Sequence, residues 1–230
     1  MTDSREWEAV FWDIGGVILD LESVRRTHDR LVGHLIREFD LSTTPAAARE
    51  TWRATLGDYF HSRDGTEFRP AREAYARAAE AVVGEPVPVT TWRSLVRRVS
   101  AEHMRPTPGA KATISRLART GLHQGVVSDV DADEGRRILR QFDVHDYFDA
   151  VTTSEEVGRT KPDPAMFRTA LERADADPER TLMVGDRYRH DMQGAANLGI
   201  HTVAFGADGG PAVDYAVSDL RELLAILDAD

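Results

Sequence analysis

The chain has 230 residues, a formal net charge of −10 at pH 7 and no cysteine. The absence of cysteine excludes disulfides, thiol nucleophiles and Cys-ligated metals, and predicts a cytoplasmic protein. The acidic charge repels phosphate backbones, so nucleic acid is not an expected partner. A membrane partner is not expected either: the polar start, MTDSREWEAV, does not resemble a signal peptide, and no apolar run approaches the roughly 20 residues of a membrane span.

Apolar spacing predicts a short buried strand over residues 8–13, followed by a helical region. Between about residues 22 and 103 the apolar residues form four helical stripes, with no convincing strand. Pro70 is expected in the first turn of one of these helices, and Thr90 or Thr91 at the cap of another. The aromatic residues of this region have helical spacing and are expected in its core: Trp52, Tyr59, Phe60 and Trp92.

From residue 104 onward the pattern changes to alternating strands and helices. Thr107 is expected to cap the first helix of this part, which ends at Gly121. The expected strands are 124–128, 148–153, 181–186, 200–205 and 215–218. The expected helices between and after them are 133–142, 163–174, 189–199 and 219–227.

This alternation predicts an α/β fold with a doubly wound, mostly parallel Rossmann-like sheet, whose right-handed crossovers place helices on both faces. We expect a core domain formed by residues 1–19 and 104–230, and an all-helical domain, residues 20–103, inserted after the first strand. Hinges between the two are expected near residues 20–23 and 104–107.

Polar side chains follow several of the expected strands, at the points where the strands end. Asp13, Ser128 and Asp186 follow or end three strands, and Lys161 lies in the loop after a fourth. Because open parallel sheets bind ligands at the carboxyl ends of their strands, we expect these side chains to meet at one edge.

Phosphoryl transfer suits this set of groups. Asp13 can attack phosphorus and form an aspartyl phosphate. Several carboxylates would repel a phosphate dianion unless a cation intervened, and Mg²⁺ prefers such oxygen ligands. Lys161 can stabilise charge on the transferring group, while Ser128 and the backbone amides around Gly15 and Gly16 can donate to phosphate oxygens.

Four stretches resemble, in the same order, the motifs of the haloacid dehalogenase superfamily of phosphohydrolases. They are DIGGV at 13–17, VVSD at 126–129, GRTKPDPAMF at 158–167 and GDRYRHD at 185–191. The helical insertion is similar to the helical cap of that family, so the resemblance covers nearly the whole chain. It implies a Mg²⁺-dependent phosphatase that acts on a small phosphorylated metabolite through an aspartyl phosphate.

The resemblance also implies a role for each matching residue. Asp13 would be the nucleophile and a metal ligand, Gly15 would offer its carbonyl to the metal, and Asp186 would be the second carboxylate ligand. Asp191 would bind the metal through water or hold Lys161, and Ser128 would hold a phosphate oxygen. Simpler readings stay open for two of these residues. Ser128 can be a structural hydroxyl, and Asp191 can stabilise a helix dipole.

Gly15 departs from the family pattern, which has at this position a second Asp that acts as general acid and base. Two alternatives therefore remain beside the phosphatase. One is a metal-independent, dehalogenase-like hydrolase, because that branch also lacks the second Asp. The other is a degenerate member that binds a phosphorylated ligand without turnover. The histidines show no metal-ligand spacing, so His28, His34 and His190 are expected at the surface or in packing.

Overall fold

The computed structural model describes residues 7–206 and 209–227. The described chain forms two compact units. One unit contains the residues up to Asp20 and from Pro106 onward, and the other is Leu21–Arg105. Residues 1–6, which form most of the polar start considered above, lie outside the described part.

The first unit is built on a six-stranded sheet in the order β3-β2-β1-β4-β5-β6, and every neighbouring pair of strands is parallel. The strands are β1 Ala9–Trp12, β2 His123–Ser128, β3 Ala150–Thr153, β4 Thr181–Gly185, β5 His201–Phe205 and β6 Tyr215–Val217. All four residues of β1 have no exposed surface, as expected for a central parallel strand covered on both faces. The register pairs Trp12 with Val126 and Val184, so the chain emerges from β1, β2 and β4 at the same edge.

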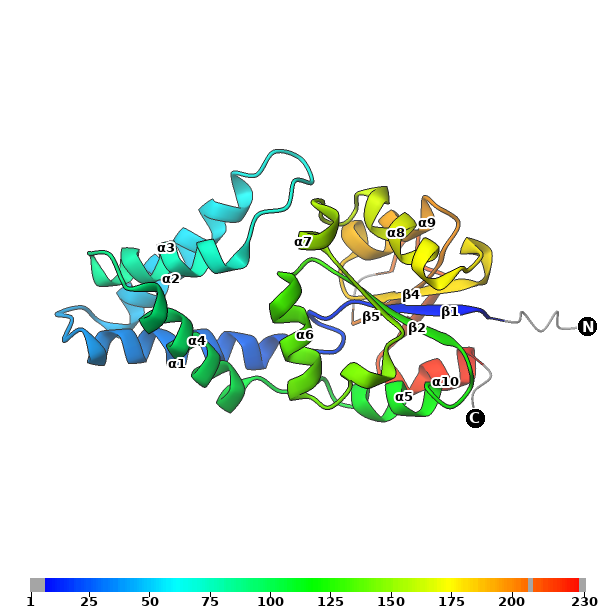
Figure 1. The fold of residues 1–230 in the computed structure, drawn as a ribbon, viewed down its shortest axis with the longest axis horizontal. Coiled ribbons are helices and arrows are strands. Elements are labelled where there is room, and N and C mark those ends of the chain that lie inside the picture. The colour runs from blue at the N-terminus through cyan, green and yellow to red at the C-terminus, as the bar shows by residue number, and fades with distance from the viewer. Residues whose placement is uncertain (1–6, 207–208, 228–230) are drawn as a thin grey trace, which may run out of the picture. The chain divides into compact units, whose positions relative to one another are not determined.

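Helices cover both faces of this sheet, which confirms the expected doubly wound α/β class (Figure 1). The α-helices are α5 Ala110–Leu117, α6 Ala132–Gln141, α7 Ser154–Val157, α8 Pro164–Ala174, α9 Gln193–Ala196 and α10 Leu223–Ile226. The other short helices are η1 His145–Tyr147, η2 Pro178–Arg180, η3 Tyr188–Met192 and η4 Leu220–Glu222. α8 and α9 pack on one face of the sheet, where Phe11 and Met183 join Phe167 in a buried apolar cluster. α5 and α10 lie together on the other face (Figure 1).

The second unit consists of four helices, in agreement with the four apolar stripes. They are α1 Leu21–Glu38, α2 Pro45–His61, α3 Ala71–Val83 and α4 Val89–His103. Leu35, Trp52 and Trp92 belong to one buried apolar cluster that holds these helices together. Tyr59 is also buried, with 3% of its surface exposed. Three of the four aromatic residues expected in this core are therefore buried, whereas Phe60 is only half-buried and lies outside the cluster.

Three helices begin at other residues than the sequence pattern predicts. α3 begins at Ala71, with Pro70 one position before it, and α4 begins directly after Pro88, so neither Thr90 nor Thr91 caps it. α5 begins after Gly109, which has the left-handed φ of +84°, and Thr107 forms only the turn before the helix. Proline and left-handed glycine fix the backbone just before a helix, and here they outweigh the side-chain caps.

The segment expected as one helix over 189–199 is also divided. It starts as the π-helix η3 and continues as the short α-helix α9. Wider turns of this kind are common at functional sites.

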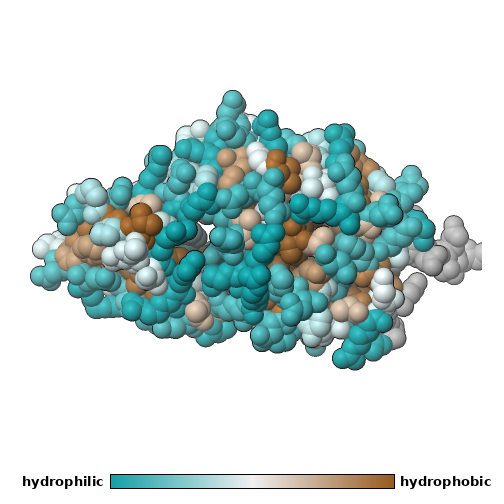
Figure 2. All heavy atoms as spheres, in the orientation of Figure 1, coloured by the Kyte–Doolittle hydropathy of each residue, from teal (hydrophilic) through white to brown (hydrophobic). Residues whose placement is uncertain are grey.

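Most of the surface seen in Figure 2 is hydrophilic over both units. Among the described residues, the exposed large apolar side chains are Leu21, Val89 and Tyr147, each on a different element. None of the described helices is both long enough and apolar enough to cross a membrane.

Candidate active site

The turn after β1 places Asp13 at the carboxyl edge of the sheet. The backbone N–H of Asp13 donates to the carbonyl of Val184 at 3.0 Å, which continues the ladder with β4, and only 3% of Asp13 is exposed. The chain then folds back, because the N–H of Gly16 donates to the carbonyl of Leu19 at 2.9 Å. The left-handed residue of this turn is Gly16, with φ of +79°, and Gly15 is not among the positive-φ residues.

Two glycines allow the carboxylates to come close to the backbone. A Cβ on Gly16 would lie 2.0 Å from Oδ2 of Asp186, and a Cβ on Gly185 would lie 2.2 Å from Cβ of Asp191. Both distances are far below any van der Waals contact, so neither position accepts a side chain while the carboxylates stay in place. A glycine is therefore needed at position 16, because the absence of a side chain there leaves room for the carboxylate of Asp186.

Lys161 lies at the centre of the site and has no exposed surface. Its Nζ atom lies 2.6 Å from Oδ1 of Asp191 and 3.2 Å from Oδ1 of Asp13, and it donates to the carbonyl of Val127 at 2.9 Å. Burial alone would lower the pKa of Lys161, but the charges of Asp13 and Asp191 outweigh it and raise the pKa above its usual range. The ammonium therefore stays charged and joins strand β2 to the segments that follow β1 and β4.

The contacts of Asp13 distinguish its two oxygens. Oδ1 accepts from the N–H of Ile14 at 2.8 Å and from the hydroxyl of Ser128 at 2.7 Å, and it faces Lys161. Within the described part of the chain, every donor and cation that contacts Asp13 reaches Oδ1, which leaves Oδ2 for another partner. Burial raises the pKa of Asp13 despite the opposing charge of Lys161.

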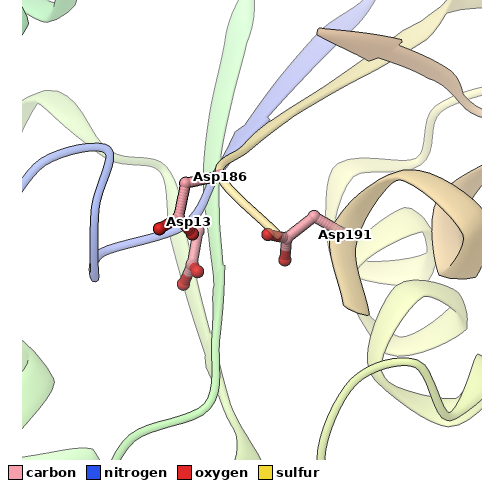
Figure 3. A group of neighbouring side chains, drawn as sticks. All are labelled: Asp13, Asp186 and Asp191. Carbon is pink, nitrogen blue, oxygen red and sulfur yellow. The ribbon is translucent and has the colours of Figure 1, made fainter. Parts of the chain in front are cut away.

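Asp186 and Asp191 complete a cluster of carboxylates with Asp13. One oxygen of each lies within 4.8 Å of the others, and Figure 3 shows Asp191 approaching from η3 toward the other two. Burial, then the charges of Asp13 and Asp191, raise the pKa of Asp186 to about 6. Oδ1 of Asp186 is buried and has no hydrogen-bond partner among the described residues. An unpartnered buried carboxylate oxygen beside a second carboxylate fits a hard cation such as Mg²⁺.

The structure brings together all five side chains that the sequence suggested for this edge: Asp13, Ser128, Lys161, Asp186 and Asp191. Asp191 is fully buried, and both of its oxygens are engaged, Oδ1 by Lys161 and Oδ2 by the N–H of Arg187 at 2.9 Å. Of the three roles considered for Asp191, this geometry favours holding Lys161.

Three residues at this edge had no expected role. Asp129, with 12% of its side chain exposed, accepts from the N–H of Lys161 at 2.7 Å and from Nη2 of Arg187 at 3.0 Å. Nδ1 of His190 lies 3.4 Å from the same carboxylate. Asp129 directly follows Ser128, and Arg187 directly follows Asp186. Their positions directly after strands could therefore have indicated that Asp129 and Arg187 lie at this edge. The motifs VVSD and GDRYRHD do not indicate that the two residues contact each other.

Comparison with known proteins identifies the family. The family profile described as haloacid dehalogenase-like hydrolase matches residues 7–199. The chain belongs to the haloacid dehalogenase-like hydrolases. The expected membership is therefore confirmed, and the carboxylate and lysine cluster lies inside a hydrolase fold.

Two curated relatives of this hydrolase are named glyceraldehyde 3-phosphate phosphatase. The enzyme of Pyrococcus furiosus is 31% identical over 136 residues, which span 56% of this chain and 57% of that enzyme. The enzyme of Methanothermobacter thermautotrophicus is 26% identical over 204 residues, or 87% of this chain and 86% of that enzyme. A crystal structure of a HAD phosphatase from Thermococcus onnurineus is 26% identical and superposes with a TM-score of 0.74, over 97% of this chain and 99% of that one.

Proposed function

We propose that this hydrolase is a Mg²⁺-dependent phosphatase that acts on a small phosphorylated sugar through an aspartyl phosphate on Asp13. The observation that carries the proposal is the asymmetry of Asp13, whose Oδ1 is held by Ser128 and Lys161 while Oδ2 is left open. The names of the two glyceraldehyde 3-phosphate phosphatases support a sugar phosphate as the substrate class.

The proposed reaction has two displacements at phosphorus. Oδ2 of Asp13 attacks phosphorus, the bond from phosphorus to the leaving oxygen breaks, and that oxygen leaves with the electron pair and takes a proton from solvent. Water then attacks the same phosphorus, the bond to Oδ2 breaks, and the carboxylate of Asp13 is restored. Orthophosphate leaves, and the surplus proton of the attacking water goes to solvent.

The remaining residues hold and stabilise the reacting groups. Lys161 fixes Asp13 and opposes the negative charge that develops near it. Ser128, whose hydroxyl donates to Asp13, is placed to donate to a phosphoryl oxygen when substrate is bound. Asp13, the Gly15 carbonyl and Asp186 would hold Mg²⁺, with Asp191 a ligand only through water. Bound Mg²⁺ would neutralise the carboxylates and polarise the phosphoryl oxygens.

The helical unit, Leu21–Arg105, is proposed to act as the cap that selects the substrate. It is inserted directly after the turn that carries Asp13, and it has a buried apolar cluster of its own. We expect it to open and close on the two connections near residues 20–23 and 104–107.

Activity against an aryl phosphate, with Mg²⁺ and in excess chelator, tests this function. The proposal predicts hydrolysis that chelation abolishes and Mg²⁺ restores. Full activity in chelator would point to the metal-independent alternative, and an inactive protein that still binds phosphate would point to the non-catalytic one.

Binding of Mg²⁺ can also be measured without turnover. We expect Mg²⁺ to raise the thermal midpoint of the wild type, because a ligand that binds the folded state stabilises it. Asp186→Asn should remove most of this increase. Asp146→Asn is a matched control, because the Asp146 side chain is 99% exposed, and it should keep the increase. An undiminished Mg²⁺ effect in Asp186→Asn would contradict the metal site.

A further inference from the structure

Arg187 is held beside the carboxylate cluster from two sides. Its backbone N–H donates to Oδ2 of Asp191 at 2.9 Å, and its Nη2 donates to Oδ2 of Asp129 at 3.0 Å. The residue directly follows Asp186 at the carboxyl end of β4. Main chain and side chain are therefore both held by carboxylates of this site.

The guanidinium of Arg187 keeps donors free for a ligand. Within the described residues, its only hydrogen-bond partner is a single oxygen of Asp129, so Nε and Nη1 have no partner. The side chain is 45% exposed, whereas Lys161 is fully buried and its Nζ is engaged by Asp13, Asp191 and the Val127 carbonyl. A planar guanidinium with free N–H groups is suited to phosphate oxygens.

Asp129 is positioned to orient this cation without touching the substrate. Its Oδ1 accepts from the N–H of Lys161 at 2.7 Å, and its Oδ2 accepts from Arg187. A single side chain after β2 thus connects the loop before α8 with the loop after β4. Because Asp129 is itself only 12% exposed, it is a fixed anchor for Arg187.

We propose that Arg187 binds the phosphoryl group of the substrate through its free N–H donors, and that Asp129 is the positioning residue that holds it there. This inference rests on the proposed phosphatase function, since it assigns a further substrate-binding residue to the same site. It goes beyond the residues to which the motifs assign a role, because Lys161 is fully buried and its Nζ faces Asp13, Asp191 and the Val127 carbonyl.

The test uses orthophosphate as the probe. Its binding to the full chain in the presence of Mg²⁺ is measured by calorimetry, and its inhibition of aryl phosphate hydrolysis by kinetics. Arg187→Ala should weaken orthophosphate binding about 10- to 100-fold, the range expected for a lost charge-assisted hydrogen bond. Arg187→Lys should recover only part of the loss. Arg189→Ala removes the same charge from an exposed neighbour two residues away and should leave binding nearly unchanged.

The direction in which Asp129→Asn changes orthophosphate affinity distinguishes a positioning role of Asp129 from a purely electrostatic effect of its charge. The amide oxygen can still accept from the N–H of Lys161, but the charge that anchors Arg187 is lost. Removing a negative charge would by itself tighten anion binding, whereas loss of positioning predicts weaker binding. We expect weaker binding in the wild-type background and almost no further effect in the Arg187→Ala background.

The outcomes also separate this inference from the proposed function. Unchanged orthophosphate binding in a folded Arg187→Ala variant would overturn the inference, as would a wild type that binds no orthophosphate. The inference would also be overturned if Arg187→Ala weakened binding only of substrates that carry a second anionic group. Arg187 would then bind that second group and not the phosphoryl group. If the wild type binds orthophosphate through Arg187 but hydrolyses no phosphate ester, only the catalytic proposal fails.

Discussion

The ammonium of Lys161 lies 2.6 Å from the carboxylate of Asp191, and neither side chain has any exposed surface. The lysine also faces Asp13 at 3.2 Å, so one buried cation serves two buried carboxylates. Such a group is costly to break, because removing one partner leaves uncompensated charge in the interior. The compact ammonium suits this position better than a guanidinium, in a chain whose other basic residues, apart from Lys111, are arginines.

The first prediction concerns this buried cation. Lys161→Met should lower the free energy of unfolding by about 3–5 kcal/mol, as is typical when one partner of a buried ion pair is removed, and should abolish turnover. Denaturant titration measures the stability change. Lys111→Met is the control: Lys111 pairs with Asp143 at 3.1 Å with both side chains at least half exposed, so the loss should stay below about 1 kcal/mol. Equal losses in the two variants would contradict the structural role of Lys161.

The second prediction concerns the glycine that faces Asp186. Gly16→Ala should remove activity and Mg²⁺ binding, because its Cβ would lie 2.0 Å from Oδ2 of Asp186 and must displace that carboxylate. Gly158→Ala is matched for backbone strain: its φ is +77° against +79° for Gly16, but nothing lies within 4 Å of its Cβ. Both variants should lose about 1 kcal/mol of stability from the left-handed backbone, with a further loss only in Gly16→Ala. Mg²⁺ affinity that stays intact in Gly16→Ala would count against this arrangement.

Much of this arrangement could be predicted from the sequence, because it depends on local patterns. Strand–helix alternation predicted the parallel sheet, and polar residues at strand ends predicted that Asp13, Ser128 and Asp186 would lie together. The link from Asp129 to Arg187 could not be predicted, since the two residues are 58 positions apart in sequence and meet only through the packing of two loops. The wrong helix starts have a local cause, namely that a left-handed glycine or a proline replaced the expected cap.

The third prediction concerns the position where the family has a second Asp. General acid–base catalysis typically contributes about 10²–10⁴-fold in rate, and Gly15 cannot supply it. Gly15→Asp should therefore raise turnover of alkyl phosphates, which have poor leaving groups, more than that of aryl phosphates. The positive φ of this turn belongs to Gly16, so an Asp at position 15 needs no left-handed backbone.

The dependence of rate on leaving-group pKa, measured for the wild type and for Gly15→Asp with folding verified for each, checks this prediction. The slope should be steeper for the wild type. The same slope in both proteins would show that another residue already provides the proton, and Asp20 and Glu22 would be the first candidates.

The fourth prediction concerns pH and the helical unit. His28 packs against Trp52 and Tyr75, with ring centroids 5.9 and 5.7 Å away, and burial lowers its pKa to about 4. An unfolded chain binds a proton at this residue below about pH 6.5, whereas the folded chain does not until about pH 4. Stability should therefore fall as the pH decreases from 6.5 to 4, by at most about 1.4 kcal/mol per pH unit from this group.

Urea midpoints across this pH range measure the effect. His28→Phe keeps an aromatic ring but removes the titrating group, so its stability should depend less on pH than that of the wild type. Tyr75→Phe removes only the hydroxyl that lies 3.3 Å from Nε2 of His28, and it should keep the wild-type dependence. Parallel pH curves for His28→Phe and the wild type would show that His28 does not titrate as expected.

The most direct test of the central claim is to trap the phosphoenzyme. An acyl phosphate is reduced by borohydride to an alcohol, so quenching the enzyme during turnover should convert the phosphorylated aspartate to homoserine, which peptide mass spectrometry locates. Because Gly15 provides no base to activate water, we expect the phosphoenzyme to accumulate. The account predicts homoserine at position 13 in the wild type, and neither the product nor turnover in Asp13→Asn. Homoserine at another position, or an Asp13→Asn variant that retains turnover, would contradict it.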